Sequence, residues 1–194
     1  YEAKKYDLIY CGGISELRGA LKILEALVIA RKEIPAMQLV FLGKYYPENF
    51  KIELEKFIIQ HDLAQNVHLF EAVSYQKVAD FYNASKIGLV LLQPVKTFEI
   101  SMPIKIFEYM SFGLPIIASN FGHMKDYIEN DKCGILVDPT NANEIAAAMT
   151  ELLSNQAIYK MHSENGRNAA IQKYRWELEF EKLLNYYKKA LSER

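Results

Sequence analysis

Short apolar runs alternate with longer helical segments along this chain, and that alternation constrains the fold more than any other feature of the sequence. The apolar runs are Asp7–Cys11, Gln38–Leu42, Val67–Phe70, Lys86–Leu92, Pro115–Ser119 and Gly134–Val137. Strands that are apolar without interruption are typical of a parallel sheet that helices cover on both faces. We therefore predict a doubly wound α/β domain with a parallel sheet of about six strands.

The segments between the apolar runs show helical signals. Helices are expected over Leu17–Arg31, Phe50–His61, Ser74–Asn83, Pro103–Phe112, Lys125–Asn130, Asn141–Leu153, Ala157–Lys173 and Trp176–Leu191. Pro103 stands in the first turn of one helix, where proline is favoured, and Gly113 is its stop signal. The segment Gln93–Met102 is expected to be a loop. In such sheets ligands bind at the carboxyl ends of the strands, so the loops after the strands are where a site is expected.

Composition excludes several classes of protein. Of the 194 residues, 51% are apolar, 24% are charged, and only 9 are glycine and 6 proline, which is a globular composition. The 23 basic residues balance the 24 acidic ones, so no overall field attracts nucleic acid, and we expect no nucleic-acid partner. No apolar run is long enough to span a membrane, and no signal peptide is visible.

The spacing of the cysteines and histidines does not indicate a metal site. Cys11 and Cys133 are the 2 cysteines and lie far apart, which suits a reducing compartment such as the cytoplasm. The histidines are scattered without ligand spacing, so we expect no metal. His123 follows a strand and a glycine, and it either lines a pocket or is simply solvated.

The first candidate site is the loop after Cys11, which reads GGISELRG. Gly12 and Gly13 would let a ligand approach the backbone, and the following helix would favour an anion. Arg18 could pair with a phosphate, and Ser15 could donate a hydrogen bond to one. The alternatives are a tight turn with a solvated arginine and a serine that caps the helix.

The second candidate site lies on the helix that starts at Pro103. Lys105 and Glu108 are three residues apart and share one face, while Ile104, Phe107 and Met110 are expected to turn toward the sheet. A cation in the first turn of a helix is poorly placed, and an anionic ligand would remove the mismatch. The Glu108 carboxylate could hold the two hydroxyls of a ribose. The alternative is an ordinary surface ion pair between the two side chains.

Five segments, in order, resemble family 4 glycosyltransferases, the large retaining group with the two-domain GT-B fold. The most specific one is PIKIFEYMSFGLPIIAS, which begins at Pro103. The others are YCGGISELRGALKILEAL, NVHLFEAVSYQKVADFYNASKIGLVLL, KCGILVDPTNANEIAAAMTELL and KYRWELEFEKLLNYYKKAL. The resemblance implies a Rossmann-like domain that is the C-terminal, donor-binding half of a GT-B fold and spans residues 1–194.

The resemblance also implies roles for single residues. Glu108 corresponds to the second glutamate of the E-x7-E motif, which holds the donor ribose. Arg18 corresponds to a basic residue at the donor diphosphate, and Lys105 to a lysine near the same phosphates. Gly12 and Gly13 correspond to the close-approach turn. Leu136 and Val137 lie on a strand that helps to wall the nucleoside pocket.

Two positions depart from the family pattern. Gly13 stands where an arginine usually follows the first loop glycine, and Lys105 is expected to compensate. Ile100 stands where the first glutamate of E-x7-E is expected, with Glu99 beside it. Either a shifted loop lets Glu99 reach the donor sugar, or that contact is lost.

The resemblance implies a hexosyltransferase that moves a sugar from a nucleoside-diphosphate donor to a glycan or lipid-linked acceptor and needs no cofactor. We expect it in the cytoplasm or at the inner face of the membrane. The chain begins at Tyr1 without methionine, so we expect a fragment that is inactive alone, whose closing helix (172–194) crosses to a preceding domain. Trp176 is expected to anchor that helix by packing. A sugar-nucleotide epimerase or phosphorylase-like enzyme on the same scaffold, and a degenerate binding domain, remain the alternatives.

Overall fold

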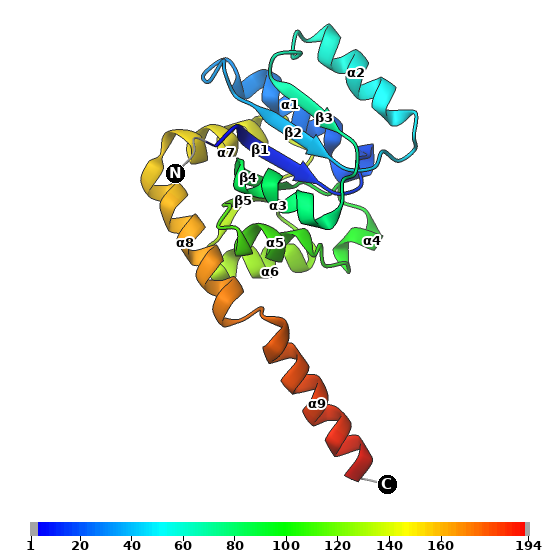
Figure 1. Ribbon diagram of the computed structural model, residues 1–194. Helices are drawn as coiled ribbons and strands as arrows, with labels where there is room; N and C mark the ends of the chain where they lie inside the picture. The colour runs from blue at the N-terminus through cyan, green and yellow to red at the C-terminus, as the bar shows by residue number, and fades with distance from the viewer. Residues whose placement is uncertain (1–3, 193–194) are drawn as a thin grey trace.

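Six parallel strands form one sheet in the order β3-β2-β1-β4-β5-β6 in the computed structural model, which describes residues 4–192 (Figure 1). The strands are β1 (Tyr6–Cys11), β2 (Leu39–Leu42), β3 (Val67–Phe70), β4 (Ser85–Val90), β5 (Ile116–Ser119) and β6 (Gly134–Val137). This is the strand order of a Rossmann-type sheet, and it confirms the predicted doubly wound α/β fold. The order reverses between β1 and β4, so a crevice is expected beyond the carboxyl ends of these two strands.

Helices cover both faces of the sheet because alternate strand residues point to opposite sides. Leu8 and Tyr10 belong to one buried cluster and Ile9 to the other. The first cluster is covered by α1 (Ala20–Ala30), α2 (Phe50–Gln60) and α7 (Ala142–Ser154). The second is covered by α3 (Tyr75–Asn83), α5 (Lys105–Ser111) and α6 (Gly122–Asp131). The strands β1, β2, β4 and β5 are therefore mostly buried on both sides, as their apolar composition predicts, whereas the edge strands β3 and β6 are partly exposed.

The helix expected from Leu17 to Arg31 is divided. A 3-10 turn, η1 (Glu16–Arg18), comes first, and Gly19 then adopts a left-handed conformation with φ of 81° before α1 begins. A Cβ atom at Gly19 would lie 2.1 Å from the carbonyl oxygen of Leu91, so only glycine fits there. Arg18 therefore lies in a turn ahead of the helix rather than inside its first turn.

The segment expected to be a loop before Pro103 contains a short helix, α4 (Lys96–Glu99). The buried face of α5 also differs from the expected one. Ile106, Tyr109 and Met110 are buried, whereas Ile104, which was expected to face the sheet, is 72% exposed. Helix α5 starts at Lys105, so Ile104 precedes its first turn and lies outside the periodic face.

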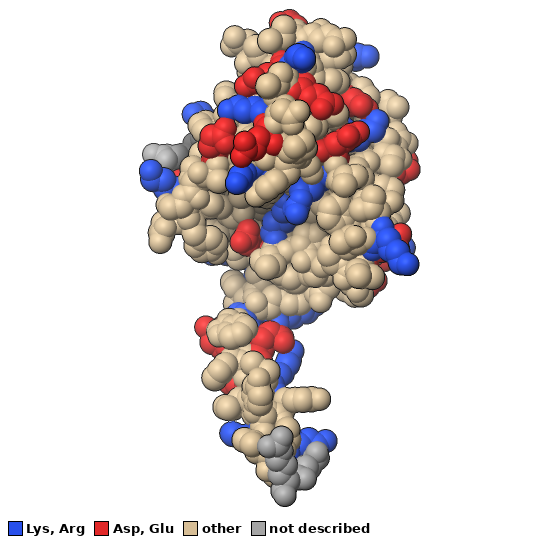
Figure 2. All heavy atoms as spheres, turned by 90° about the vertical axis from the view of Figure 1, so that its right-hand side faces the viewer, with Lys and Arg blue, Asp and Glu red and all other residues tan. Residues whose placement is uncertain are grey.

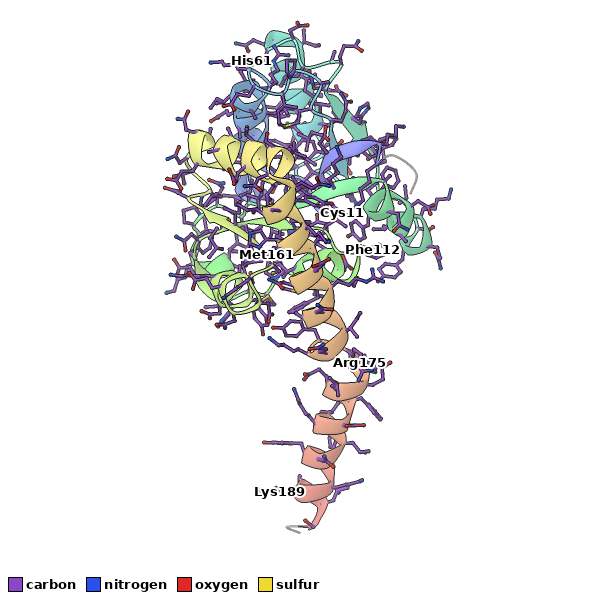
Figure 3. The ribbon with its side chains drawn as sticks, turned by 90° about the vertical axis from the view of Figure 1, so that its left-hand side faces the viewer. Cys11, His61, Phe112, Met161, Arg175 and Lys189 are labelled. Atoms are coloured by element: carbon purple, nitrogen blue, oxygen red, sulfur yellow. The ribbon has the colours of Figure 1, made fainter. Side chains whose placement is uncertain are left out.

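Two helices close the described chain, α8 (Gln156–Gln172) and α9 (Trp176–Ser192). Helix α8 packs along α5, and α9 then leads away from the body of the domain (Figures 1 and 3). Trp176 does not anchor α9 by packing within the described residues, because it is 70% exposed and no described residue of α9 is buried. Among residues 4–192, no helix combines the length and apolarity that a membrane span requires.

Candidate functional site

The two loops that the sequence singles out meet at the carboxyl edge of the sheet. The loop after β1 and the segment that joins β4 to α5 flank the point where the strand order reverses. The strand β1 points toward the right-hand side of the view in Figure 1, and Figure 2 shows the molecule from that side. Lysine and arginine atoms gather near the middle of the face seen there. The sheet topology thus unites residues that lie far apart in the sequence.

Hydrogen bonds to neighbouring elements hold the start of the glycine loop after β1 in place. The Gly12 N–H donates to the carbonyl of Leu42 at 2.9 Å. The Tyr10 hydroxyl donates to the carbonyl of Gly13 at 2.6 Å, and the N–H of Cys11 donates to the Tyr109 hydroxyl at 3.0 Å. Gly12 has a φ of 132°, a conformation that side chains disfavour. The loop is therefore a fixed, bare stretch of backbone.

Lys105 extends from the start of α5 toward this loop. Its Nζ atom would lie 3.0 Å from a Cβ at Gly12, and it lies 4.0 Å from the centre of the Tyr10 ring. The Nζ atom is buried and has no hydrogen-bond partner among the described residues. Burial, followed by the nearby positive charge of Arg18, lowers the pKa of Lys105 to about 7.

The unpartnered Lys105 amine is the most unusual feature of the site. A buried cation without a hydrogen-bonded partner is costly, so such groups are rare unless they serve a function. The attraction of the Tyr10 ring for a cation offsets only part of this cost. An anion placed over the Gly12 loop would supply the missing partner.

Arg18 lies beside the same loop. Its side chain is part-buried, with the guanidinium carbon 5.9 Å from the centre of the Phe98 ring. A Cβ at Gly13 would lie 3.5 Å from Arg18 Nε. Burial raises the pKa of Tyr10 to about 12, and the charge and hydrogen bonding of Arg18 oppose that rise. Arg18 and Lys105 therefore both border Tyr10, so the arginine is not a freely solvated side chain.

Glu108 lies one turn after Lys105 but is not ion-paired with it. Within residues 4–192 no salt bridge joins the two side chains, so the alternative of a surface ion pair does not hold. The Glu108 carboxylate instead accepts a hydrogen bond through Oε2 from the Tyr82 hydroxyl at 2.7 Å. Glu108 is part-buried, so its carboxylate is held by the protein and still reached by solvent.

The remaining sequence candidates lie at different distances from this cluster. Ser15 precedes the 3-10 turn, but its hydroxyl makes no capping hydrogen bond. The exposed Glu99 follows Phe98 at the end of α4, and its backbone touches Gly122, where a Cβ would lie 2.7 Å from the Glu99 carbonyl. The contact of Glu99 with a donor sugar stays a prediction.

Leu136 and Val137 are neighbours on β6 but have different surroundings. Val137 is 4% exposed and belongs to the core cluster under α1 and α7. Leu136 lines a shallow hollow of about 290 Å³ between α6, β6 and α8, together with Lys132, Met161 and His162. Their role in walling a nucleoside pocket is not tested by this arrangement and stays a prediction.

Sequence reasoning missed Tyr10 and Tyr82. Both are nearly or fully buried, at 0% and 2% exposure, and both direct a hydroxyl to a site element. Tyr10 is a polar-tipped residue one position before a strand end, which is a usable sequence signal. Tyr82 gave no such signal, because a tyrosine near the end of an amphipathic helix is ordinary.

Metal-ligating groups are not clustered in the described chain. Among residues 4–192, no group of three or more His, Cys, Asp or Glu side chains could hold a metal ion. His123 is exposed near the start of α6. The basic side chains that border the glycine loop are those of Lys105, beside Gly12, and Arg18, beside Gly13.

Comparison with known proteins identifies the family. Residues 2–169 match the family described as "Glycosyl transferases group 1". The chain belongs to this family. Six parallel strands with flanking helices also match solved GT-B glycosyltransferase structures, which confirms the Rossmann-like half of that fold.

Two relatives and one solved structure illustrate how this glycosyl transferase domain relates to others. Spore coat protein SA of Bacillus subtilis (strain 168) is 27% identical over 192 residues, which are 95% of this chain and 49% of the relative. The MMP alpha-(1->4)-mannosyltransferase of Mycolicibacterium hassiacum is 25% identical over 177 residues, or 91% of this chain and 41% of the enzyme. The structure of the Anabaena protein HepE in complex with UDP matches with a TM-score of 0.82 at 15% identity. The match covers 95% of this chain and 49% of the HepE chain.

The chain thus spans about half the length, or less, of the curated relatives that it matches. The family assignment rests on the matched residues 2–169, which include the glycine loop, Arg18, Lys105 and Glu108. Helix α9 lies outside the matched segment.

Proposed function

We propose that this glycosyl transferase domain binds the nucleoside-diphosphate sugar donor of a retaining, family 4-like hexosyltransferase. The observation that carries the proposal is the buried, unpartnered Nζ of Lys105 over the Gly12 loop, with Arg18 beside it. Two cations at a bare backbone turn form a site for a polyanion such as a diphosphate. The UDP complex of HepE, which has the same fold, supports a nucleotide as the ligand.

In the proposed mechanism, Arg18 and Lys105 stabilise the charge that develops on the departing nucleoside diphosphate. Glu108 accepts hydrogen bonds from the ribose hydroxyls and so places the diphosphate over the glycine loop. The bond between the anomeric carbon and the phosphate oxygen breaks, and the acceptor oxygen forms its bond on the same face of the sugar. The acceptor proton leaves toward the phosphate. Gly12, Gly13 and Ser15 contact the phosphates, and Glu99, Leu136 and Val137 line the donor pocket.

In this proposal the transfer needs no cofactor and no bound metal, because side-chain cations and backbone N–H groups stabilise the negative charge of the diphosphate. The acceptor is a glycan or a lipid-linked sugar, and a preceding domain of the same protein binds it. We place the protein in the cytoplasm or at the inner face of the membrane. The free cysteines Cys11 and Cys133 support a reducing compartment.

Helix α9 fits the proposed role of a closing helix that crosses to a preceding domain. Its apolar side chains recur at helical spacing on one face and are 40–70% exposed, namely Trp176, Phe180, Leu183, Leu184, Tyr187 and Leu191. Exposure of an apolar stripe of this kind to water is unfavourable, so a second surface that covers it would be favoured. We propose that the chain alone transfers no sugar.

Calorimetry of the chain with UDP, GDP and ADP tests the proposed function. At least one of them should bind, and Glu108→Ala should weaken that binding by about tenfold or more, because hydrogen bonds to a charged acceptor are lost. Glu33→Ala, which removes an exposed carboxylate in the turn between α1 and β2, is the matched control and should leave binding unchanged. No binding at millimolar nucleotide, or equal binding by Glu108→Ala, would contradict the proposal.

A degenerate, non-catalytic binding domain is the second candidate. The observation that favours it is the pair of departures from the family pattern. Gly13 stands in place of the usual arginine, and a Cβ added there would lie 3.3 Å from the ring of Tyr46. Ile100 stands in place of the first glutamate and is 76% exposed. Sugar transfer by a longer protein that contains this chain, lost in Arg18→Ala, would exclude this candidate. Formation of an epimer from a sugar nucleotide without acceptor would instead indicate an epimerase.

A further inference from the structure

Tyr82 is a buried polar residue that the proposed mechanism does not use. It lies near the end of α3 and is 2% exposed. Its ring packs edge-on against Tyr109 at 5.3 Å and Phe112 at 5.2 Å, both from the α5 segment that also carries Glu108. Aromatic contacts of this kind fix the orientation of the ring and hence of its hydroxyl.

The Tyr82 hydroxyl has one proton, and it donates that proton to Oε2 of Glu108 at 2.7 Å. Burial raises the pKa of Tyr82 far above its ordinary value, and neighbouring Tyr109 and Cys11 raise it further. The raised pKa keeps this hydroxyl a hydrogen-bond donor at neutral pH. A protonated donor opposite a carboxylate makes a strong, directional hydrogen bond.

The other carboxylate oxygen of Glu108 is differently placed. In residues 4–192 no hydrogen bond engages Oε1, whereas Oε2 is held by Tyr82. A glutamate side chain loses considerable rotamer freedom when it is fixed by a ligand. A glutamate whose plane is already fixed by the protein presents its second oxygen to a ligand without that loss.

We propose that Tyr82 is the positioning residue for Glu108, holding the carboxylate in the plane in which it accepts the two ribose hydroxyls of the donor nucleotide. Tyr82 itself does not touch the nucleotide. This inference rests on the proposed function, because it takes Glu108 as the ribose contact. It adds a specificity role: Tyr82 sets how strongly the site prefers a ribonucleotide to a nucleotide that lacks those hydroxyls.

The test uses Tyr82→Phe, which removes the hydroxyl and keeps the ring. Calorimetry measures the binding of whichever of UDP, GDP and ADP binds best and of its 2′,3′-dideoxy counterpart, for the unaltered chain and for Tyr82→Phe, Glu108→Gln and Tyr75→Phe. Tyr75→Phe is the matched control, because it removes a hydroxyl from the same helix at a residue that is 76% exposed. The readout is the ratio of the two affinities within each protein.

The unaltered chain and Tyr75→Phe should share one preference for the ribonucleotide. Tyr82→Phe should reduce that preference by about three- to tenfold, through weaker binding of the ribonucleotide only. A fraction of unfolded chain lowers both apparent affinities equally, so the ratio remains interpretable if the variant is destabilised.

Two outcomes separate the inference from the function on which it rests. If Glu108→Gln abolishes the preference while Tyr82→Phe keeps it, or weakens both nucleotides equally, then Tyr82 has no positioning role. If the unaltered chain shows no preference at all, Glu108 is not the ribose contact, and the proposed function fails with the inference.

Discussion

Two basic residues in the site, Lys105 and Arg18, lie near a backbone turn and form no salt bridge with a carboxylate among residues 4–192. Lys105 is the more constrained of the two, since its amine is buried while its stem is part-exposed. Like charge between the two side chains contributes to the lowered pKa of Lys105. Both residues thus remain available for an anionic ligand, and each leads to a prediction.

The first prediction concerns Arg18. Arg18→Ala should weaken binding of a nucleoside diphosphate by about 10- to 100-fold, because a charge-assisted contact to phosphate is lost. Binding of the nucleoside alone should not change. Arg175→Ala removes the same charge at the exposed junction of α8 and α9 (Figure 3) and should have no effect in the same titration. Equal losses for nucleoside and diphosphate would contradict a phosphate contact.

The second prediction concerns pH. Lys105 has a pKa of about 7 without ligand. The free chain therefore loses the ammonium charge as the pH rises through 7, and a bound diphosphate must then bring a proton back. Affinity should fall as the pH is raised from 7 to 9, by at most about tenfold per pH unit, which is the limit for one linked proton.

Lys105→Met is the control for this pH dependence. It should bind the diphosphate weakly at pH 7 and lose little more by pH 9. Titration of the phosphate itself is common to both proteins, so it cancels in the comparison. A parallel fall in affinity for both proteins would show that Lys105 does not titrate in this range.

At the scale of secondary structure elements, α5 is placed by its contact with β4. A Cβ at Gly88 of β4 would lie 2.4 Å from the ring of Tyr109, which is fully buried. Tyr109 in turn accepts the hydrogen bond from the Cys11 N–H at the end of β1. The absence of a side chain at Gly88 thus lets α5 approach the sheet and places Lys105 beside the glycine loop.

Gly88→Ala should therefore destabilise the domain by about 1–3 kcal/mol through overpacking. The free energy of unfolding in urea measures this. Gly166→Ala in α8 is the comparison variant. Its added Cβ would lie 3.3 Å from the Cβ of Cys133, and the helix would gain propensity, so this variant should be destabilised less than Gly88→Ala. Equal stability of Gly88→Ala and the unaltered chain would show that Tyr109 shifts easily.

For the whole molecule, the boundary between the packed domain and its final helix lies just after Tyr174. Asp131, at the end of α6, is buried and accepts hydrogen bonds from Lys173 and from the Tyr174 hydroxyl. The Tyr174 ring also packs on Phe107 of α5 at 4.9 Å and on Tyr127 at 5.5 Å. Beyond this point no described residue is buried.

Removal of residues 176–194 should therefore change the Tm by less than about 2 °C, because almost no buried area is lost. Removal of residues 172–194 should lower the Tm by about 6 °C or more, because buried Asp131 loses its partners. Thermal unfolding followed by circular dichroism compares the two. A large effect of the shorter truncation would show that α9 supports this domain directly.

Much of the fold and the site could be predicted from the sequence. All six strands and the α/β class were predicted correctly, since apolar patterning and glycine signals act locally. Lys105 and Glu108 were placed on one helix by their spacing. The break at Gly19, the short helix α4 and the exposure of Ile104 were not, because each depends on contacts with another part of the chain.

The sequence by itself determined which segments form strands and helices, and therefore which loops end at the carboxyl edge of the sheet. Only the tertiary structure decided that Tyr10, Lys105 and Gly12 meet, and that Tyr82 holds Glu108. The physical reason is that burial and hydrogen-bond partners depend on which strands and helices pack together. Local sequence patterns determine the strands and helices. The packing of these elements against one another buries the Lys105 amine without a partner and orients the Glu108 carboxylate.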